Sequence, residues 1–332
     1  MVVVVQAELA QDEAVHFPAR LIATEPQDVL DFCSNISRAC DASDNIVLDA
    51  SALTFIDPFG LAMLRATMES VDDKYFHVRY MHQGLIDHLV RMEFFQGLEV
   101  EGFDAESARN FQGDPEHCVE LIRVQQGNSE AIASRLIQAM TGLKCDEQAL
   151  DEEQDAVRRP IEYALKELLE NSLSHAKKEG NGNASVWVAC QHFSDDIVRL
   201  AIVDNGCGFL ATLRDHAMLK EKTHLAAIEA ALIERVSCNR GPNIGYETDS
   251  QNQGVGLTTT ARIAAAASGH LIVASGDAWV RTDDGLQQVM TGSSWKGVAI
   301  AFTCHREKLH LVKISELLPK TEAVADDEIS FD

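Results

Sequence analysis

Three short stretches decide how this chain folds: Glu167-Leu-Leu-Glu-Asn-Ser-Leu-Ser-His-Ala176, Asp204-Asn-Gly-Cys-Gly-Phe209 and Asn252-Gln-Gly-Val-Gly-Leu257. The first lies in a helical pattern that starts at Pro160, since proline is favoured at the first position of a helix. The second ends an apolar run, 197–203, which polar residues separate from a similar run at 185–190, as in a hairpin. The third opens an Ala-rich segment that reaches Ala267 and is predicted as a helix. Helices and strands in this order predict an α/β domain.

The first stretch places two polar groups one helical turn apart. Glu167 and Asn171 are separated by four residues, so their side chains lie on the same side of the helix. A carboxylate in such a pair can hold a water for in-line attack, and the amide oxygen can ligate a hard cation such as Mg²⁺. An ordinary solvated helix face is the alternative interpretation.

The two glycine-bearing stretches suit a nucleotide. Asp204 follows an apolar strand and precedes Gly206 and Gly208, whose missing side chains let the backbone approach a flat ligand while the carboxylate accepts from an exocyclic amine. Gly254 and Gly256 open a helix, whose N-terminal amides and dipole can receive phosphate oxygens. Either stretch alone is weak evidence, so the interpretation depends on their occurrence together.

In this order and spacing the three stretches resemble the N, G1 and G2 boxes of the GHKL superfamily of ATP-binding domains, which includes gyrase, a heat-shock chaperone, histidine kinases and MutL. The resemblance covers roughly residues 155–304. It implies a Bergerat-type α/β sandwich, in which a mixed sheet carries helices on one face. It also implies ATP and Mg²⁺ as cofactors and an ATP lid over 209–253, which is longer than the serine kinases of the superfamily usually carry.

The resemblance assigns roles to the residues of the boxes. Asn171 would ligate Mg²⁺, and Asp204 would read the adenine amino group. Glu167 matches the residue that polarises water in the hydrolysing members, and also a Glu of the serine kinases that repress sigma factors. The end of the first stretch, 171–176, resembles those serine kinases more than gyrase. The rest of the expected nucleotide-binding set surrounds the adenine and the phosphates: His175, Gly206, Gly208, Gly254, Val255, Gly256 and Leu257.

The N-terminal third carries a second resemblance. Residues 46–61 resemble the central strand, loop and helix start of a STAS domain, and residues 84–98 resemble its late helix and following turn. The resemblance implies that this region binds protein partners. In the anti-sigma antagonists of that family a phosphorylated Ser follows the Asp, whereas Pro58 follows Asp57 here. The family's phosphorylation switch is therefore absent at this position, and the sequence does not favour a substitute at Ser51 or Thr54.

Two rival classes of enzyme fit the sequence less well. A histidine kinase needs an acceptor histidine at the start of a long dimerising helix, and the nearest candidate, His88, fits a surface turn of the late STAS-like helix better. A dinucleotide-binding enzyme is suggested by residues 206–211, which match G-x-G-x-x-A after a strand. The acidic residue expected about 20 positions later should end a second strand, but that region is predicted to be helical.

Composition and charge disfavour some classes of binding partner and indicate a cellular location. The chain has 332 residues with 52 acidic and 28 basic side chains, a formal charge of −24 that disfavours nucleic acid and anionic membrane surfaces. No apolar run approaches the roughly 20 residues of a membrane helix, and the opening Met1-Val-Val-Val-Val-Gln lacks the features of a secretion signal, so a cytoplasmic location is expected. The eight cysteines include no C-x-x-C pair, which argues against a zinc site or a disulfide framework.

These patterns predict a two-domain α/β protein. The expected parts are a STAS-like protein-interaction domain at 1–103, a helical connector at 104–154, the GHKL domain at 155–315 and an acidic tail at 316–332. The expected function is a Mg·ATP-binding regulator that controls a protein partner by ATP-dependent switching or by serine/threonine phosphorylation. The partner would be STAS-type or sigma-factor-like. A slow ATPase and a non-catalytic ATP-sensing scaffold are the alternatives, and the oligomeric state, a homodimer included, is left open.

Overall fold

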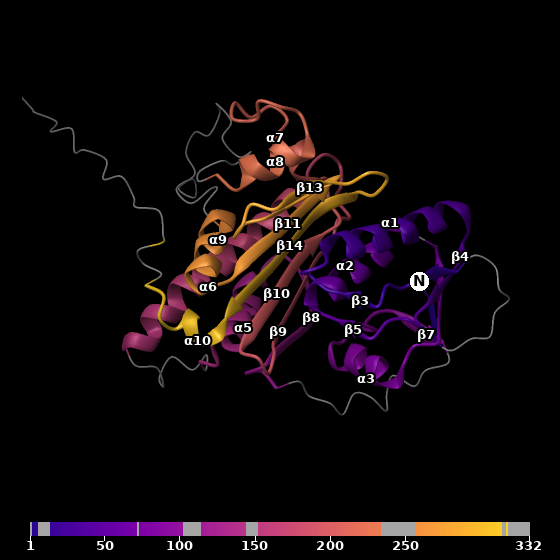
Figure 1. Ribbon diagram of the computed structural model, residues 1–332, viewed down its shortest axis with the longest axis horizontal. Coiled ribbons are helices and arrows are strands. Elements are labelled where there is room, and N and C mark those ends of the chain that lie inside the picture. Colours follow the sequence, from indigo (N-terminus) through magenta and orange to yellow (C-terminus); the bar gives the residue numbers. More distant parts are fainter. Residues whose placement is uncertain are drawn as a thin grey trace, which may run out of the picture.

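The computed structural model describes residues 2–5, 14–71, 73–101, 114–143, 152–233, 256–313 and 317 (Figure 1). The N-terminal part, residues 2–101, is built on a five-stranded parallel sheet. Its strands, in sheet order, are β2 (Val15–His16), β4 (Asn45–Asp49), β6 (Tyr75–Arg79), β1 (Val2–Val5) and β7 (Glu99–Glu101). Two short strands pair beside it, β3 (Arg20–Leu21) and β5 (Phe55–Ile56). The helices are α1 (Pro26–Ala42), α2 (Pro58–Glu69) and α3 (Gln83–Arg91).

Local chemistry explains where α2 begins. The Asp57 carboxylate caps the helix by accepting from the backbone N–H groups of Phe59 and Gly60, and Pro58 supplies a first helical residue that needs no hydrogen bond. Gly60 is required because a Cβ there would lie 2.3 Å from the carbonyl oxygen of Leu21. The strand at 45–49 and this helix match the elements expected from the sequence.

A seven-stranded sheet forms the rest of the core. Its strands, in sheet order, are β13 (Gln287–Val289), β12 (Ala278–Arg281), β11 (His270–Gly276), β14 (Trp295–His305), β10 (Ile197–Asp204), β9 (Val186–His192) and β8 (Cys118–Val124). Every pairing described in this sheet is antiparallel, which corrects the expectation of a mixed sheet. Three of its six described pairings, β9–β10, β11–β12 and β12–β13, join consecutive strands by hairpins, and a hairpin connection makes neighbours antiparallel.

The segment expected to be a helical connector, 104–154, contributes to this sheet. Its described residues contain the edge strand β8, which pairs with β9, and helix α5 (Ser129–Thr141). The register of β8 shifts between Val119 and Ile122. In agreement with this shift, the sequence lacks the strict alternation of apolar residues that identifies a strand. For this reason β8 was not predicted.

Helix α6 (Glu152–Ala176) starts before the expected position at Pro160, which lies inside it. One side-chain pair lies before the proline and a second spans it: Arg159 lies 2.7 Å from Asp155, and Arg158 lies 3.1 Å from Glu162. Val157 adds a buried apolar contact. These contacts hold the first turns of the helix although proline removes one backbone donor.

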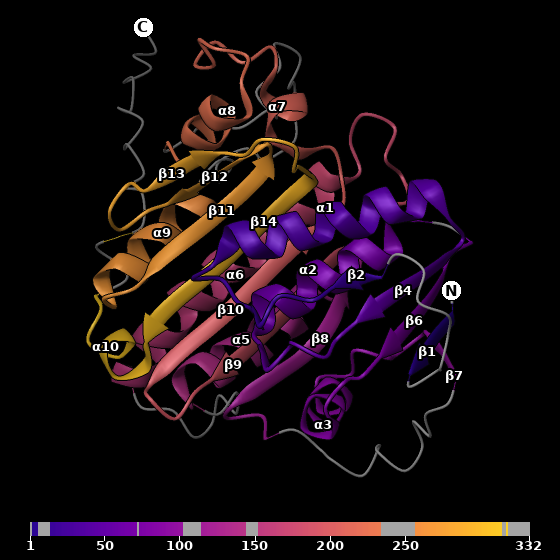
Figure 2. The same cartoon turned by 45° about the vertical axis from the view of Figure 1, so that its right-hand side comes forward.

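Helices cover both faces of the seven-stranded sheet, as Figures 1 and 2 show. On one face lie α5, α6 and α9 (Gly256–Ala266). On the other face lie α1 and α2, so the N-terminal part and the sheet share one apolar core. The expectation of helices on one face therefore holds for the helices of the GHKL-like region and is corrected for the whole sheet, since the N-terminal helices bury the second face.

Three short helices complete the described structure: α7 (Gly208–Leu213), α8 (His224–Ala231) and α10 (Arg306–Leu309). Helices α7 and α8 fall in the expected lid, 209–253, whose residues from 234 onward lie outside the described residues. The expected acidic tail also lies outside them, apart from Leu317. In the part of the chain that the structure covers, no helix combines the length and apolar character needed to cross a membrane.

Candidate nucleotide site

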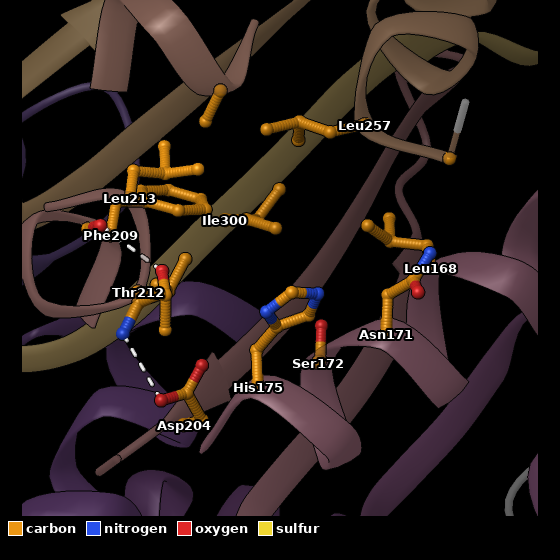
Figure 3. Close-up of a pocket in the computed structure, with 13 residues that line it drawn as sticks. Leu168, Asn171, Ser172, His175, Asp204, Phe209, Thr212, Leu213, Leu257 and Ile300 are labelled. Carbon is orange, nitrogen blue, oxygen red and sulfur yellow. Dashed lines mark hydrogen bonds between the residues drawn. The ribbon is translucent and has the colours of Figure 1, made fainter. Parts of the chain in front are cut away.

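A pocket lies where α6, α7 and the start of α9 meet β14 (Figure 3). Most of its wall is apolar: Leu168, Phe209, Leu213, Ala231, Gly256, Leu257, Val298 and Ile300. Its polar groups are few: Asn171, Ser172, His175, Asp204 and Thr212. An apolar cavity with a small number of placed polar groups is the usual form of a small-molecule site.

Asp204 is the acidic group of this pocket. It ends β10 and is only 4% exposed. Its Oδ1 accepts from the backbone N–H groups of Gly206, at 2.9 Å, and Val298, at 3.2 Å. Its other oxygen points toward the pocket interior and accepts no hydrogen bond from any described residue (Figure 3). Burial raises the pKa of this carboxyl to about 7, although the two backbone N–H groups oppose the shift.

Helix α6 supplies the opposite side of the pocket. Figure 3 shows Asn171 at the far end from Asp204, with Ser172 and His175 between them. Burial, with a smaller contribution from the charge of Lys178, lowers the pKa of His175 to about 4. His175 therefore presents a neutral imidazole at neutral pH. The structure brings Asn171, His175 and Asp204 to one pocket, and their roles toward a nucleotide stay predictions.

The glycines after Asp204 serve packing in the structure. A Cβ at Gly206 would lie 2.4 Å from the backbone of Ala176, at the end of α6. Gly208 has a φ of +74°, and a Cβ there would lie 2.8 Å from the Ser275 hydroxyl and the Lys296 carbonyl. Neither glycine lines the pocket. Their missing side chains bring the turn against α6 and β14, and this contact sets the position of Asp204.

Gly256 and Leu257, which were predicted to bind the nucleotide, line the pocket at the start of α9. A Cβ at Gly256 would lie 3.3 Å from the backbone of Leu168 and 3.6 Å from the side-chain amide of Asn171. Glycine thus permits α9 to start close beside α6. Gly254 and Val255, also expected at the site, lie outside the described residues.

Glu167 lies one turn before Asn171 on α6 and does not line the pocket. It is partly exposed. Burial raises the pKa of Tyr163, and the charges of Glu167 and Glu170 raise it further. The geometry places its carboxylate on the helix beside the pocket and not inside it.

The family comparison agrees with this geometry. Residues 156–291 match the family model described as "Histidine kinase-, DNA gyrase B-, and HSP90-like ATPase". These residues form a domain of that family. The match begins inside α6, contains the strands β9 to β13 and ends before β14. A comparison of the chain with curated proteins found no match.

Domains of this ATPase family bind ATP, and the described pocket fits the adenine end of that ligand. Apolar walls suit a flat aromatic base, and the open oxygen of Asp204 suits an amino group. For Mg²⁺, the described residues offer the amide oxygen of Asn171, and they contain no cluster of three or more His, Cys, Asp or Glu side chains arranged to hold a metal. One protein oxygen fits Mg²⁺ when phosphates and waters complete its coordination.

Several pocket residues were not expected from the sequence. Phe209, Thr212 and Leu213 come from α7, in the first turns of the expected lid, and Val298 and Ile300 come from β14. The Thr212 hydroxyl donates to the carbonyls of Phe209 and Gly208, which ties α7 together beside the pocket. The apolar positions that follow the glycines were the available signal for α7, whereas the contribution of β14 depends on strand order.

Proposed function

We propose that this chain binds Mg·ATP in the pocket and uses the bound nucleotide to control a protein partner. The observation that carries the proposal is the buried Asp204 carboxylate, whose one oxygen is held by two backbone N–H groups while the other faces an apolar cavity. A buried carboxylate without a basic partner has a high free energy when ionised, and a ligand amino group that donates to it lowers that energy.

The remaining roles follow the order of groups along the pocket. Asp204 accepts from the adenine amino group, and Phe209, Leu213 and Ile300 pack on the base. Asn171 ligates Mg²⁺, which when bound neutralises charge on the phosphates. Phosphate oxygens meet the start of α9 at Gly256 and Leu257, because the first N–H groups of a helix have no partner within it. The resemblance adds Gly254 and Val255 to this set.

The first test is calorimetric titration of the full chain with ATP, with and without Mg²⁺. Asp204→Asn places an amide where the amino group must donate, so we expect at least a tenfold loss of affinity. Asp195→Asn is the matched control, because Asp195 is exposed in the turn at the other end of the β9–β10 hairpin. Equal ATP affinity in Asp204→Asn and the wild type would contradict the assignment.

The pH dependence gives a second test of Asp204. Its pKa is raised to about 7, so below that pH a proton occupies the carboxyl and competes with the adenine amino group. We expect ATP affinity to fall by up to about tenfold per pH unit below 7 and to level off above it. A flat profile between pH 5 and 8 would mean that the ionised carboxylate does not receive the nucleotide.

Turnover is proposed to depend on Glu167, which would orient water or the attacking hydroxyl. Glu167→Gln should keep ATP affinity and lower hydrolysis or phosphate transfer about a hundredfold. Glu170→Gln is the control, since Glu170 lies on the same helix and accepts from the hydroxyl of Ser129 at 2.8 Å. Equal turnover in both variants would exclude Glu167 as the base, and ATP binding without any turnover in the wild type would favour the ATP-sensing scaffold.

Partner control is proposed for the N-terminal part, on its resemblance to STAS domains. Pro58 is buried, and Asp57 is fully buried at 3.3 Å from Arg199 of the sheet. Because α1 and α2 are occupied within the chain, a STAS-type or sigma-factor-like partner would meet the surfaces that remain, which include the exposed Ser51 and Thr54. Labelled phosphate transferred from ATP to such a partner, and lost in Glu167→Gln, would support the kinase version of this function.

A further inference from the structure

The segment at 293–298, which leads into β14, is hydrogen-bonded to the N-terminal part. The hydroxyl of Ser34, on α1, accepts from the backbone N–H of Ser294 at 3.0 Å and donates to its carbonyl at 3.2 Å. Beside it, the Ser293 hydroxyl donates to the carboxylate of Asp31. Ser34 is 8% exposed, so little water competes for these bonds. One side chain of α1 therefore fixes both backbone groups of Ser294.

The same segment is bonded to Asp204 at its other end. The indole N–H of Trp295 donates to the Asp204 carbonyl at 3.0 Å, and the backbone N–H of Val298 donates to Oδ1 of its carboxylate at 3.2 Å. Gly297 passes so close that a Cβ would lie 2.0 Å from the Asp204 carbonyl oxygen. The pairing with β11 shifts register here: Ser275 pairs with Val298 and Gly276 with Trp295, so the ladder skips the two residues between them. The Ser275 hydroxyl donates to the Gly297 carbonyl at 2.9 Å, so the segment is held from β11 as well as from α1.

We infer that Ser34 is a positioning residue for adenine recognition: through Ser294 it holds the Val298 N–H against Asp204, so that the second carboxylate oxygen stays turned toward the ligand. This inference rests on the proposed function. It connects α1, more than 160 residues away in sequence, with the group that reads the base. It also requires that nucleotide binding tighten α1 on the sheet, because coupling between two sites is reciprocal.

The test compares two serine variants on one helix. Ser34→Ala removes both bonds to Ser294, whereas Ser37→Ala, one turn later, removes a hydroxyl that donates only to the Cys33 carbonyl inside α1. We expect the Kd for Mg·ATP to rise about fivefold in Ser34→Ala and to stay unchanged in Ser37→Ala. Thermal melting shows that both variants are folded at the titration temperature.

The pH profile separates positioning from a general loss of stability. The Val298 N–H lowers the pKa of Asp204, so a displaced segment moves the midpoint of ATP affinity to higher pH in Ser34→Ala. His175 is the other titratable side chain that lines the pocket, and its pKa of about 4 keeps it out of this range.

Three outcomes of these titrations decide whether Ser34 positions Asp204. A higher Kd and a shifted midpoint in Ser34→Ala alone would support the inference. Wild-type values in Ser34→Ala, or equal changes in both variants, would refute it while leaving the ATP site intact. Absence of ATP binding by the wild type would refute the proposed function and this inference together.

Discussion

The two faces of the seven-stranded sheet are buried by different means. Toward α5, α6 and α9 the strands present large aliphatic and aromatic side chains, among them Leu200, Ile202, Ile300 and Phe302. Toward α1 and α2 they present mainly alanine and tryptophan: Ala189, Ala201, Ala274, Ala299, Ala301, Trp187, Trp279 and Trp295. Because side chains alternate along a strand, one stretch of sequence builds both surfaces.

The difference shows how two unlike parts are joined. In register, Ala201 lies opposite Ala301 on one neighbouring strand and Ala189 on the other, so a row of methyl groups runs beneath the N-terminal helices. Small side chains let helix and sheet backbones approach closely. The tryptophans reach further, and two of them donate to groups at the boundary: Trp187 to Glu69 of α2 and Trp295 to Asp204.

The largest expected effect comes from removing volume on the face of large side chains. Phe302 is 2% exposed and lies between Leu200 and Leu271 in the sheet. Phe302→Ala should lower the free energy of unfolding by about 3–5 kcal/mol, because it leaves a cavity that the packed helices cannot close. Urea unfolding measures the change, with Phe302→Leu as the smaller step. A loss below about 1 kcal/mol would mean that this face is loosely packed.

Adding volume tests the opposite face. Ala201 is fully buried, and Ala201→Leu should cost about 1–3 kcal/mol and should speed hydrogen exchange in α2, because the added atoms force the helix away from the sheet. Leu200→Met, on the adjacent residue and the other face, keeps its volume and should cost less than about 1.5 kcal/mol. If Ala201→Leu unfolds like the wild type, the close approach of α2 does not depend on alanine.

The smallest expected effect is a difference in the stability cost of replacing two tryptophans on the face toward α1 and α2. The Trp187 indole N–H donates to Oε2 of Glu69 at 3.0 Å, and the Arg65 guanidinium lies 4.6 Å from its ring centre. The Trp279 indole N–H has no hydrogen-bond partner in the described structure, although both residues are 5% exposed. Trp187→Phe should therefore cost about 1–2 kcal/mol more than Trp279→Phe in urea unfolding. Equal costs would indicate that the bond to Glu69 contributes no net stability.

Much of the site could be predicted from sequence because its signals are local. The four-residue spacing of Glu167 and Asn171, the strand before Asp204 and the glycine turn each lie within a few residues. The pocket indeed gathers Asn171, His175, Asp204, Gly256 and Leu257. The role of Gly206 was not predictable in this way, since the atoms that exclude its side chain belong to Ala176, distant in the sequence.

The sequence also indicates that the strands of the seven-stranded sheet are buried on both faces, although this indication can be interpreted only with the structure known. The runs at 186–190 and 200–203 are apolar at successive positions, which is typical of a strand buried on both sides. Such a run does not predict which helices pack against the second face. The bulge in β8 and the early start of α6 were hidden because irregular pairing and side-chain contacts outweigh the local pattern.

The sequence by itself determined the local chemistry: a helix with a carboxylate and an amide one turn apart, a strand that ends in an aspartate, and glycines where backbones meet. Only the tertiary structure decided that α1 and α2 cover the sheet and that Ser34 reaches the segment that bonds to Asp204. The physical reason is range. Hydrogen bonds and periodicity along one element depend on residues that are neighbours in the sequence. Packing, in contrast, joins surfaces whose residues are far apart in the chain.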